Sequence, residues 1–207
     1  MQKKDMTHFS EEIQGIYRLK VPFEELYTSV FLIDAEQVKI LVDCATTAED
    51  VDTYIIPALH ALNYSLPDVD ILVLTHRHED HAGGTERMLE IAPNIEVVTD
   101  TRQLCKSIIT YPLPGHTEDS IGVLDERTHT LISGDGLQGA GVGKYRCTIK
   151  NFAMYQETLK RIDADERIEN ILFSHAYEPW FQAYAFGRPT VRKCLSDCEK
   201  YGKESKI

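Results

Sequence analysis

The feature that most constrains the fold is a nearly continuous apolar run over residues 69–75, which leads directly into a polar stretch, Thr75-His76-Arg77-His78-Glu79-Asp80-His81. A short apolar run of this kind is typical of a strand that is buried on both faces, as in sheets that helices cover. Proteins with α/β sheets build their sites at the carboxyl ends of the strands. The run therefore predicts an α/β fold with a functional site directly after this strand.

Strand and helix patterns alternate along both halves of the chain. Apolar and β-branched runs predict strands, and apolar residues at helical spacing predict helices. We expect further strands at about 30–33, 39–42, 95–98, 107–110, 121–124, 130–133 and 171–173, and helices at about 51–62, 82–91, 151–163 and 179–201. Thr46 followed by Glu49 indicates a capping box ahead of the first helix. This alternation predicts layered α/β architecture.

Composition narrows the class of protein. We expect a single domain over residues 1–207, because this length suits one domain with a substantial core. The formal charge of −11 disfavours nucleic acid as a partner, since phosphate contacts need clustered cations. The apolar runs are too short to cross a membrane, and five cysteines without a signal peptide favour reduced thiols. We therefore expect a cytoplasmic protein with a small-molecule partner, and leave the oligomeric state open.

Metal-ligand residue types follow the ends of several predicted strands. In extended backbone His76 and His78 point to the same side, whereas the turn into a helix at Ala82 directs Asp80 and His81 toward a second point. One short peptide can thus supply ligands to two adjacent metal ions. Three further candidates follow other predicted strands, namely His116, Asp135 and His175. Imidazole and carboxylate ligands suit zinc, iron and manganese, so the residues alone do not choose the ion.

The order of these motifs, H-x-H-x-D-H followed by PGHT, GD and SH, resembles the metallo-β-lactamase superfamily. The resemblance extends over nearly the whole chain and includes Leu41-Val42-Asp43. It implies a four-layer αββα sandwich with the site between the edges of the two sheets. It also implies two divalent ions, with zinc first and iron or manganese as alternatives. By this resemblance the first ion has the ligands His76, His78 and His116, the second has Asp80, His81 and His175, and Asp135 bridges them.

A glycine-rich stretch, GDGLQGAGVGKY at residues 134–145, permits two interpretations that fail. A dinucleotide fingerprint needs a helix that begins within its glycines, and a phosphate loop needs Ser or Thr where Tyr145 stands. The stretch is similar instead to a segment of glyoxalase II, the hydroxyacylglutathione thioesterase. That resemblance makes Lys144, with Tyr145 beside it, the candidate contact for an anionic substrate; a solvated loop lysine is the alternative.

Two further features bear on the substrate and on the last helix. Tyr177 stands two residues after His175, so its hydroxyl is a candidate substrate contact, with a packing role as the alternative. The sequence leaves room for only one long helix after His175, so we expect no counterpart of the C-terminal helical domain of glyoxalase II. Cys194 and Cys198 share a face of that helix, and packing is favoured because a metal site would need more ligands.

The leading hypothesis is a metal-dependent hydrolase in which two ions hold and deprotonate a water molecule. Asp80 would orient this nucleophile and pass its proton to the leaving group of a small thioester or lactone. The alternatives are a mononuclear iron persulfide dioxygenase, a phosphodiesterase or β-lactamase-like hydrolase of the same superfamily, or a metal sensor without catalysis. The commonest class B β-lactamases have a cysteine where Asp135 stands, which argues against β-lactams as substrates.

Overall fold

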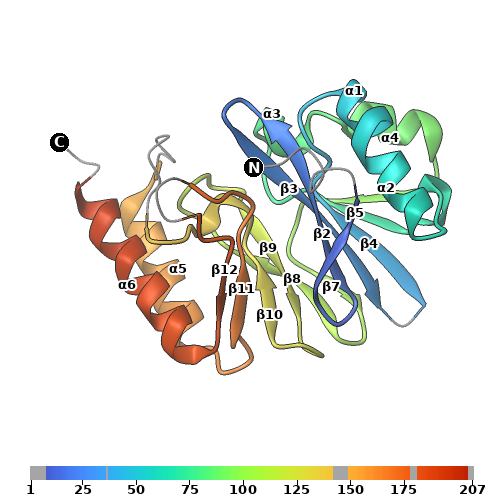
Figure 1. Cartoon of the computed structure of the whole chain (residues 1–207). Coiled ribbons are helices and arrows are strands. Elements are labelled where there is room, and N and C mark those ends of the chain that lie inside the picture. Colours follow the sequence, from blue (N-terminus) through green and yellow to red (C-terminus); the bar gives the residue numbers. More distant parts are fainter. Residues whose placement is uncertain (1–7, 36, 142–148, 178–180, 205–207) are drawn as a thin grey trace. The chain divides into compact units, whose positions relative to one another are not determined.

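The structure is a computed structural model that describes residues 8–35, 37–141, 149–177 and 181–204 (Figure 1). The chain divides into two compact units, residues 1–99 and 100–207. Each unit contains one six-stranded sheet, and each sheet carries helices. Among the described residues, no helix combines the length and the apolar character that a membrane span requires.

The first unit contains a mixed sheet whose parallel strands end at the predicted metal-ligand stretch. Its strands, in spatial order, are β1 (Ser10–Ile13), β2 (Ile16–Phe23), β3 (Leu26–Ala35), β4 (Val38–Val42), β5 (Ile71–Val73) and β6 (Glu96–Val98). β1 to β4 are antiparallel, whereas β4, β5 and β6 are parallel, with Val42 opposite Val73 and Val73 opposite Val98. The carboxyl ends of these three strands therefore meet at one edge of the sheet.

The helices of the first unit follow β4 and β5. A helical stretch runs through α1 (Ala48–Asp50), the π-helical segment Val51–Ile55 and α2 (Ile56–Ala61), and later come a 3₁₀ turn at Leu66–Asp68, α3 (Glu79–Ala82) and α4 (Thr85–Ile91). The predicted capping box was wrong by one residue: Thr47 is the N-cap, and Asp50 completes the box in place of Glu49. Thr47 has the extended backbone that an N-cap needs, and its hydroxyl accepts from the Asp50 amide.

One hydrophobic core holds this unit together. Helix residues such as Val51, Ile55 and Leu59 pack with strand residues such as Leu41 and Leu72. All three residues of β5 are buried, which confirms the prediction of a strand without a solvent-exposed face. This packing fixes the position of the loop that follows β5.

The second unit contains the other mixed sheet. Its strands, in spatial order, are β12 (Tyr184–Phe186), β11 (Asn170–Leu172), β10 (Thr130–Ile132), β9 (Ile121–Asp125), β8 (Ile108–Pro112) and β7 (Gln103–Cys105). β10 and β11 are parallel neighbours, and the other neighbouring pairs in this order are antiparallel. The helices α5 (Phe152–Ala164) and α6 (Arg188–Glu204) lie side by side in Figure 1 and share a core with this sheet. Cys194 and Cys198 are buried in that core, as a packing role requires.

The last predicted helix was wrong at its beginning. It starts at Arg188 rather than near residue 179, and Tyr184–Phe186 form the edge strand β12 instead. The alternation of exposed Tyr184, buried Ala185 and exposed Phe186 has the period of a strand. Gly187 follows with φ +80°, a conformation that ends the strand, and Pro189 then suits the first turn of α6. The short strands β1 and β7 were likewise not predicted from the sequence.

Candidate metal centre

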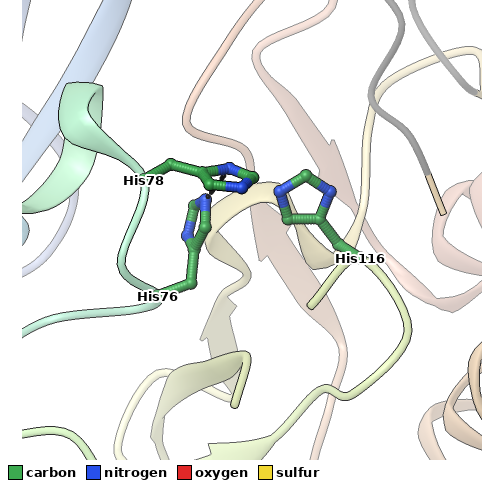
Figure 2. Close-up of side chains that lie close together, drawn as sticks. All are labelled: His76, His78 and His116. Atoms are coloured by element: carbon green, nitrogen blue, oxygen red, sulfur yellow. Dashed lines mark hydrogen bonds between the residues drawn. The ribbon is translucent and has the colours of Figure 1, made fainter. Parts of the chain in front are cut away.

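Four ligand candidates of the first unit lie on the loop after β5 and on the first turn of α3. His76 Nε2 and His78 Nδ1 lie 3.0 Å apart. Figure 2 shows the two imidazoles next to each other. Because α3 begins at Glu79, the chain turns there, and His81 Nε2 lies 3.3 Å from Asp80 Oδ2. The structure thus brings together the two pairs that the spacing suggested, one from the extended loop and one from the helix.

Asp43 orients two of these imidazoles from the end of β4. Its Oδ2 lies 2.6 Å from His81 Nδ1 and accepts the hydroxyl of Thr75 at 2.9 Å, while its Oδ1 accepts the Thr75 amide at 2.8 Å. The same Thr75 hydroxyl lies 3.1 Å from His76 Nδ1. Partners of this kind on Nδ1 fix the ring tautomer and present Nε2 to a metal, a common arrangement around ligating histidines.

Cys44 lies beside this network but does not belong to the donor set. Its thiol donates to the backbone oxygen of His81 at 3.4 Å and lies 3.3 Å from the Thr85 hydroxyl. Burial raises the pKa of the Cys44 thiol to about 12. Cys44 is fully buried and belongs to the hydrophobic core of the first unit, which assigns its side chain to packing.

Three ligand candidates of the second unit also come together. Each follows a strand: His116 comes after β8, Asp135 after β10 and His175 after β11. Asp135 Oδ1 lies 3.2 Å from His175 Nε2, and its Oδ2 lies 3.8 Å from His116 Nε2. One carboxylate oxygen is therefore directed toward each histidine, which is the arrangement that a bridging carboxylate requires.

The loop that carries His116, drawn in Figure 2, is held by α5. Gly115 has φ +145°, and a Cβ at this position would lie 2.7 Å from the Cβ of Tyr155. The Asn151 amide donates to the Gly115 oxygen at 3.1 Å, and the Thr158 hydroxyl donates to the Pro114 oxygen at 2.8 Å. The backbone before His116 thus packs directly on the helix, with no room for a side chain at residue 115.

Of the three residues predicted to bind substrate, the structure describes Tyr177. Lys144 and Tyr145 lie outside the described part of the chain. Tyr177 is buried, its ring centroid lies 5.7 Å from that of His175, and its hydroxyl accepts from Gln138 Nε2 at 3.4 Å. Tyr177 therefore borders the candidate ligands of the second unit.

Sequence reasoning missed the roles of Asp43 and Thr75. Asp43 stands at the carboxyl end of a strand, as the ligand candidates do, so the same placement rule could have singled it out. Its contact with Thr75 and His81 depends on the parallel register of β4 and β5, which no local pattern specifies.

The donor set fits borderline and hard divalent ions. The first unit contributes three imidazoles and one carboxylate, and the second contributes two imidazoles and one carboxylate. Structural and catalytic zinc sites use these groups, as do iron and manganese sites. The chemistry of the side chains thus agrees with metal binding and leaves the identity of the ion open.

Comparison with known sequences gives partial matches. Residues 24–102 match the family model of the metallo-beta-lactamase superfamily. A hydroxyacylglutathione hydrolase of Francisella tularensis is 28% identical over 111 residues, which cover 45% of this chain and 44% of that protein. The beta-lactamase-like protein 2 homolog of Drosophila melanogaster is 29% identical over 164 residues, 65% of this chain and 54% of that protein. The matches thus span only about half the length of these relatives.

Solved structures match nearly the whole chain. The metallo-beta-lactamase FIM-1 from Pseudomonas aeruginosa, in its mono-zinc form, has a TM-score of 0.73 at 18% identity and covers 98% of this chain and 99% of its own. A metallo-beta-lactamase from Erythrobacter litoralis has a TM-score of 0.69 at 19% identity, with 93% and 96% covered. At these identities the likeness establishes the fold alone, and it confirms the fold class predicted from the sequence.

Proposed function

We propose that this chain, whose residues 24–102 match the metallo-beta-lactamase superfamily model, is a metal-dependent hydrolase. The observation that carries the proposal is Asp135, which directs one carboxylate oxygen toward each of two histidines. Its placement between His116 and His175 suits a carboxylate shared by two ions. In this proposal the first ion has the ligands His76, His78 and His116, and the second has Asp80, His81 and His175.

The protein groups around such a centre have separate tasks. Divalent ions, when bound, lower the pKa of water to about 7 and polarise a carbonyl oxygen. Asp80, held beside His81, orients the nucleophile and passes a proton to the leaving group. Asp43 and Thr75 keep the imidazoles of His76 and His81 in one orientation. Zinc is the proposed ion, with iron and manganese as alternatives because they accept the same ligands.

The proposed substrate is a small thioester or lactone, and an anionic one. Three features support this class: an aspartate at position 135, the glycine-rich loop with Lys144 and Tyr145, and the similarity to proteins named hydroxyacylglutathione hydrolase. A thiolate is a good leaving group and needs little protonation, so Asp80 suffices as the acid. The amine that leaves from an amide would need a stronger acid than Asp80. The net charge of −11 disfavours nucleic acid as substrate.

A panel of substrates tests the proposal. The metal-replete protein is incubated with a small thioester, a lactone, a phosphodiester and a β-lactam, and its metal content is measured by elemental analysis. We expect hydrolysis of the thioester or the lactone to exceed that of the others. Oxygen consumption with a persulfide, together with one iron per chain and no hydrolysis, would overturn the hydrolase in favour of the dioxygenase.

A further inference from the structure

Exposed aromatic side chains gather in one short segment of the second unit. Among the described residues, four large hydrophobic side chains are exposed: Leu89 at 36%, Phe181 at 59%, Tyr184 at 47% and Phe186 at 37%. Three of the four fall within six consecutive residues, and we name these three, Phe181, Tyr184 and Phe186, the aromatic platform. Grouped apolar exposure of this kind marks a binding surface more often than scattered single residues do.

The backbone holds the platform residues toward solvent. Tyr184 and Phe186 flank the buried Ala185 on the edge strand β12, so they share one face, and their rings stack at 4.4 Å with planes 16° apart. Phe181 has φ +46°, a conformation that is costly for a bulky residue. Its amide donates to the Tyr177 oxygen at 2.8 Å, which stabilises this strained backbone. Residues in such costly backbone conformations cluster at functional sites, so Phe181 is a candidate for a functional role.

The platform borders the candidate metal ligands of its own unit. Tyr184 pairs with Leu172 at the end of β11, and His175 follows that end by three residues. The loop that continues from Asp135 also reaches the platform. A Cβ at Gly139 in this loop would lie 2.6 Å from the Cβ of Gln182, so the loop packs against the residue next to Phe181. Tyr177 connects the platform to the ligand candidates. Its ring contacts His175, and its backbone oxygen accepts the amide of Phe181.

We propose that the aromatic platform binds the apolar acyl group of the substrate. The inference rests on the proposed function and deepens it: the preferred thioesters carry a medium or long apolar acyl chain rather than a short hydroxyacyl group. A short polar acyl group held at His175 would not need three exposed aromatic rings next to the site. Full burial of one methylene group of the acyl chain raises its binding affinity about fourfold. An open platform buries each methylene only in part, so we expect a gain of up to about fourfold for each added methylene.

Acyl-chain dependence of the rate tests this proposal. kcat/KM is measured for acetyl, butyryl and octanoyl thioesters of one thiol with the metal-replete protein, with the Phe181→Ser variant and with the Tyr184→Ser/Phe186→Ser variant. We expect kcat/KM of the wild type to rise at least tenfold from acetyl to octanoyl. Each variant should lose most of this rise in kcat/KM from acetyl to octanoyl. Leu89→Ser, which removes the exposed side chain on α4, is the matched control and should keep the rise.

A binding experiment separates failure of the platform from failure of the proposed function. The chain has one tryptophan, Trp180, next to Phe181 in the sequence, so its fluorescence can report octanoate binding. Octanoate should bind the wild type at least tenfold more tightly than the platform variants, even if no thioester is hydrolysed. Equal octanoate affinity in wild type and variants would overturn the proposal, and so would a rise with acyl length that both variants retain. If the wild type is a dimer and the platform variants are monomers, the platform binds a second copy of the chain. That result would also overturn the proposal.

Discussion

The carboxylate of Asp43 lies 2.6 Å from Nδ1 of His81, although 38 positions separate the two residues in the chain. Asp43 has φ +63°, a conformation that asparagine also tolerates, so Asp43→Asn should fold. The side-chain amide of asparagine binds the His81 imidazole more weakly than the Asp43 carboxylate does. Substitution of a group that orients a ligating histidine typically lowers metal affinity 10- to 100-fold. We expect a loss of about this size for zinc, measured by competition with a chromogenic chelator.

Asp34→Asn is the matched control for this variant. Asp34 lies on the neighbouring strand β3 and accepts the hydroxyl of Tyr64, away from the candidate ligands. Its substitution should leave zinc affinity unchanged. Equal zinc affinity in Asp43→Asn and the wild type would show that the Asp43 contact does not orient a ligand.

Asp80→Ala should abolish most of the activity. The variant loses the proposed ligand of the second ion and the carboxylate proposed to handle the proton. General acid–base groups alone contribute about 10²- to 10⁴-fold to the rate. We expect kcat/KM for a thioester to fall by at least that factor. Glu79→Ala, which removes the exposed neighbouring carboxylate, should retain activity. Comparable rates in the two variants would exclude Asp80 from the chemistry.

Lys144→Ala should affect substrate binding rather than the chemical step. An ionic contact with the substrate carboxylate has the same strength in the ground state and in the transition state, so its loss raises KM and leaves kcat almost constant. We expect this pattern for anionic thioesters only. Lys150→Ala serves as the control because it removes an exposed lysine a few residues away. A KM that stays constant for every anionic substrate would refute the assignment.

Gly115→Ala should destabilise the second unit. A Cβ at this position would lie 2.7 Å from the Cβ of Tyr155 and 2.8 Å from its Cα, and φ +145° disfavours any side chain. Gly187→Ala shares the strain of a positive φ, but its nearest neighbour atom, Cδ of Pro189, is 3.9 Å away. We expect a free energy of unfolding lower by about 1–2 kcal/mol for Gly187→Ala. Gly115→Ala should lose at least about 1 kcal/mol more; equal losses in denaturant titrations would mean that the loop before His116 is adaptable.

The sequence predicts those parts of the fold that have a local signal. Most strands and α5 lie close to their expected positions because apolar runs and helical spacing are local patterns. The same is true of the ligand candidates, since each follows a strand whose pattern is visible. Residues 184–186 were missed as a strand because three residues carry little periodicity, and their pairing with β11 depends on distant residues.

Contacts between distant segments account for the rest. The hydrogen bonds of Asp43 with Thr75 and His81 arise from the parallel register of β4 and β5 across an intervening helix. The aromatic platform was likewise invisible to sequence patterns, because the exposure of Tyr184 and Phe186 depends on β12 being an edge strand. Register and edge position are properties of the assembled sheet, and a single sequence does not encode them in any short motif.

The most direct test of the central claim is the rate of thioester hydrolysis as zinc is added back to metal-depleted protein. The account predicts a rate near background without zinc, which rises with added zinc and reaches its plateau at two ions per chain. A full rate in the metal-depleted protein, or a plateau at one ion per chain, would contradict the proposed two-ion hydrolase.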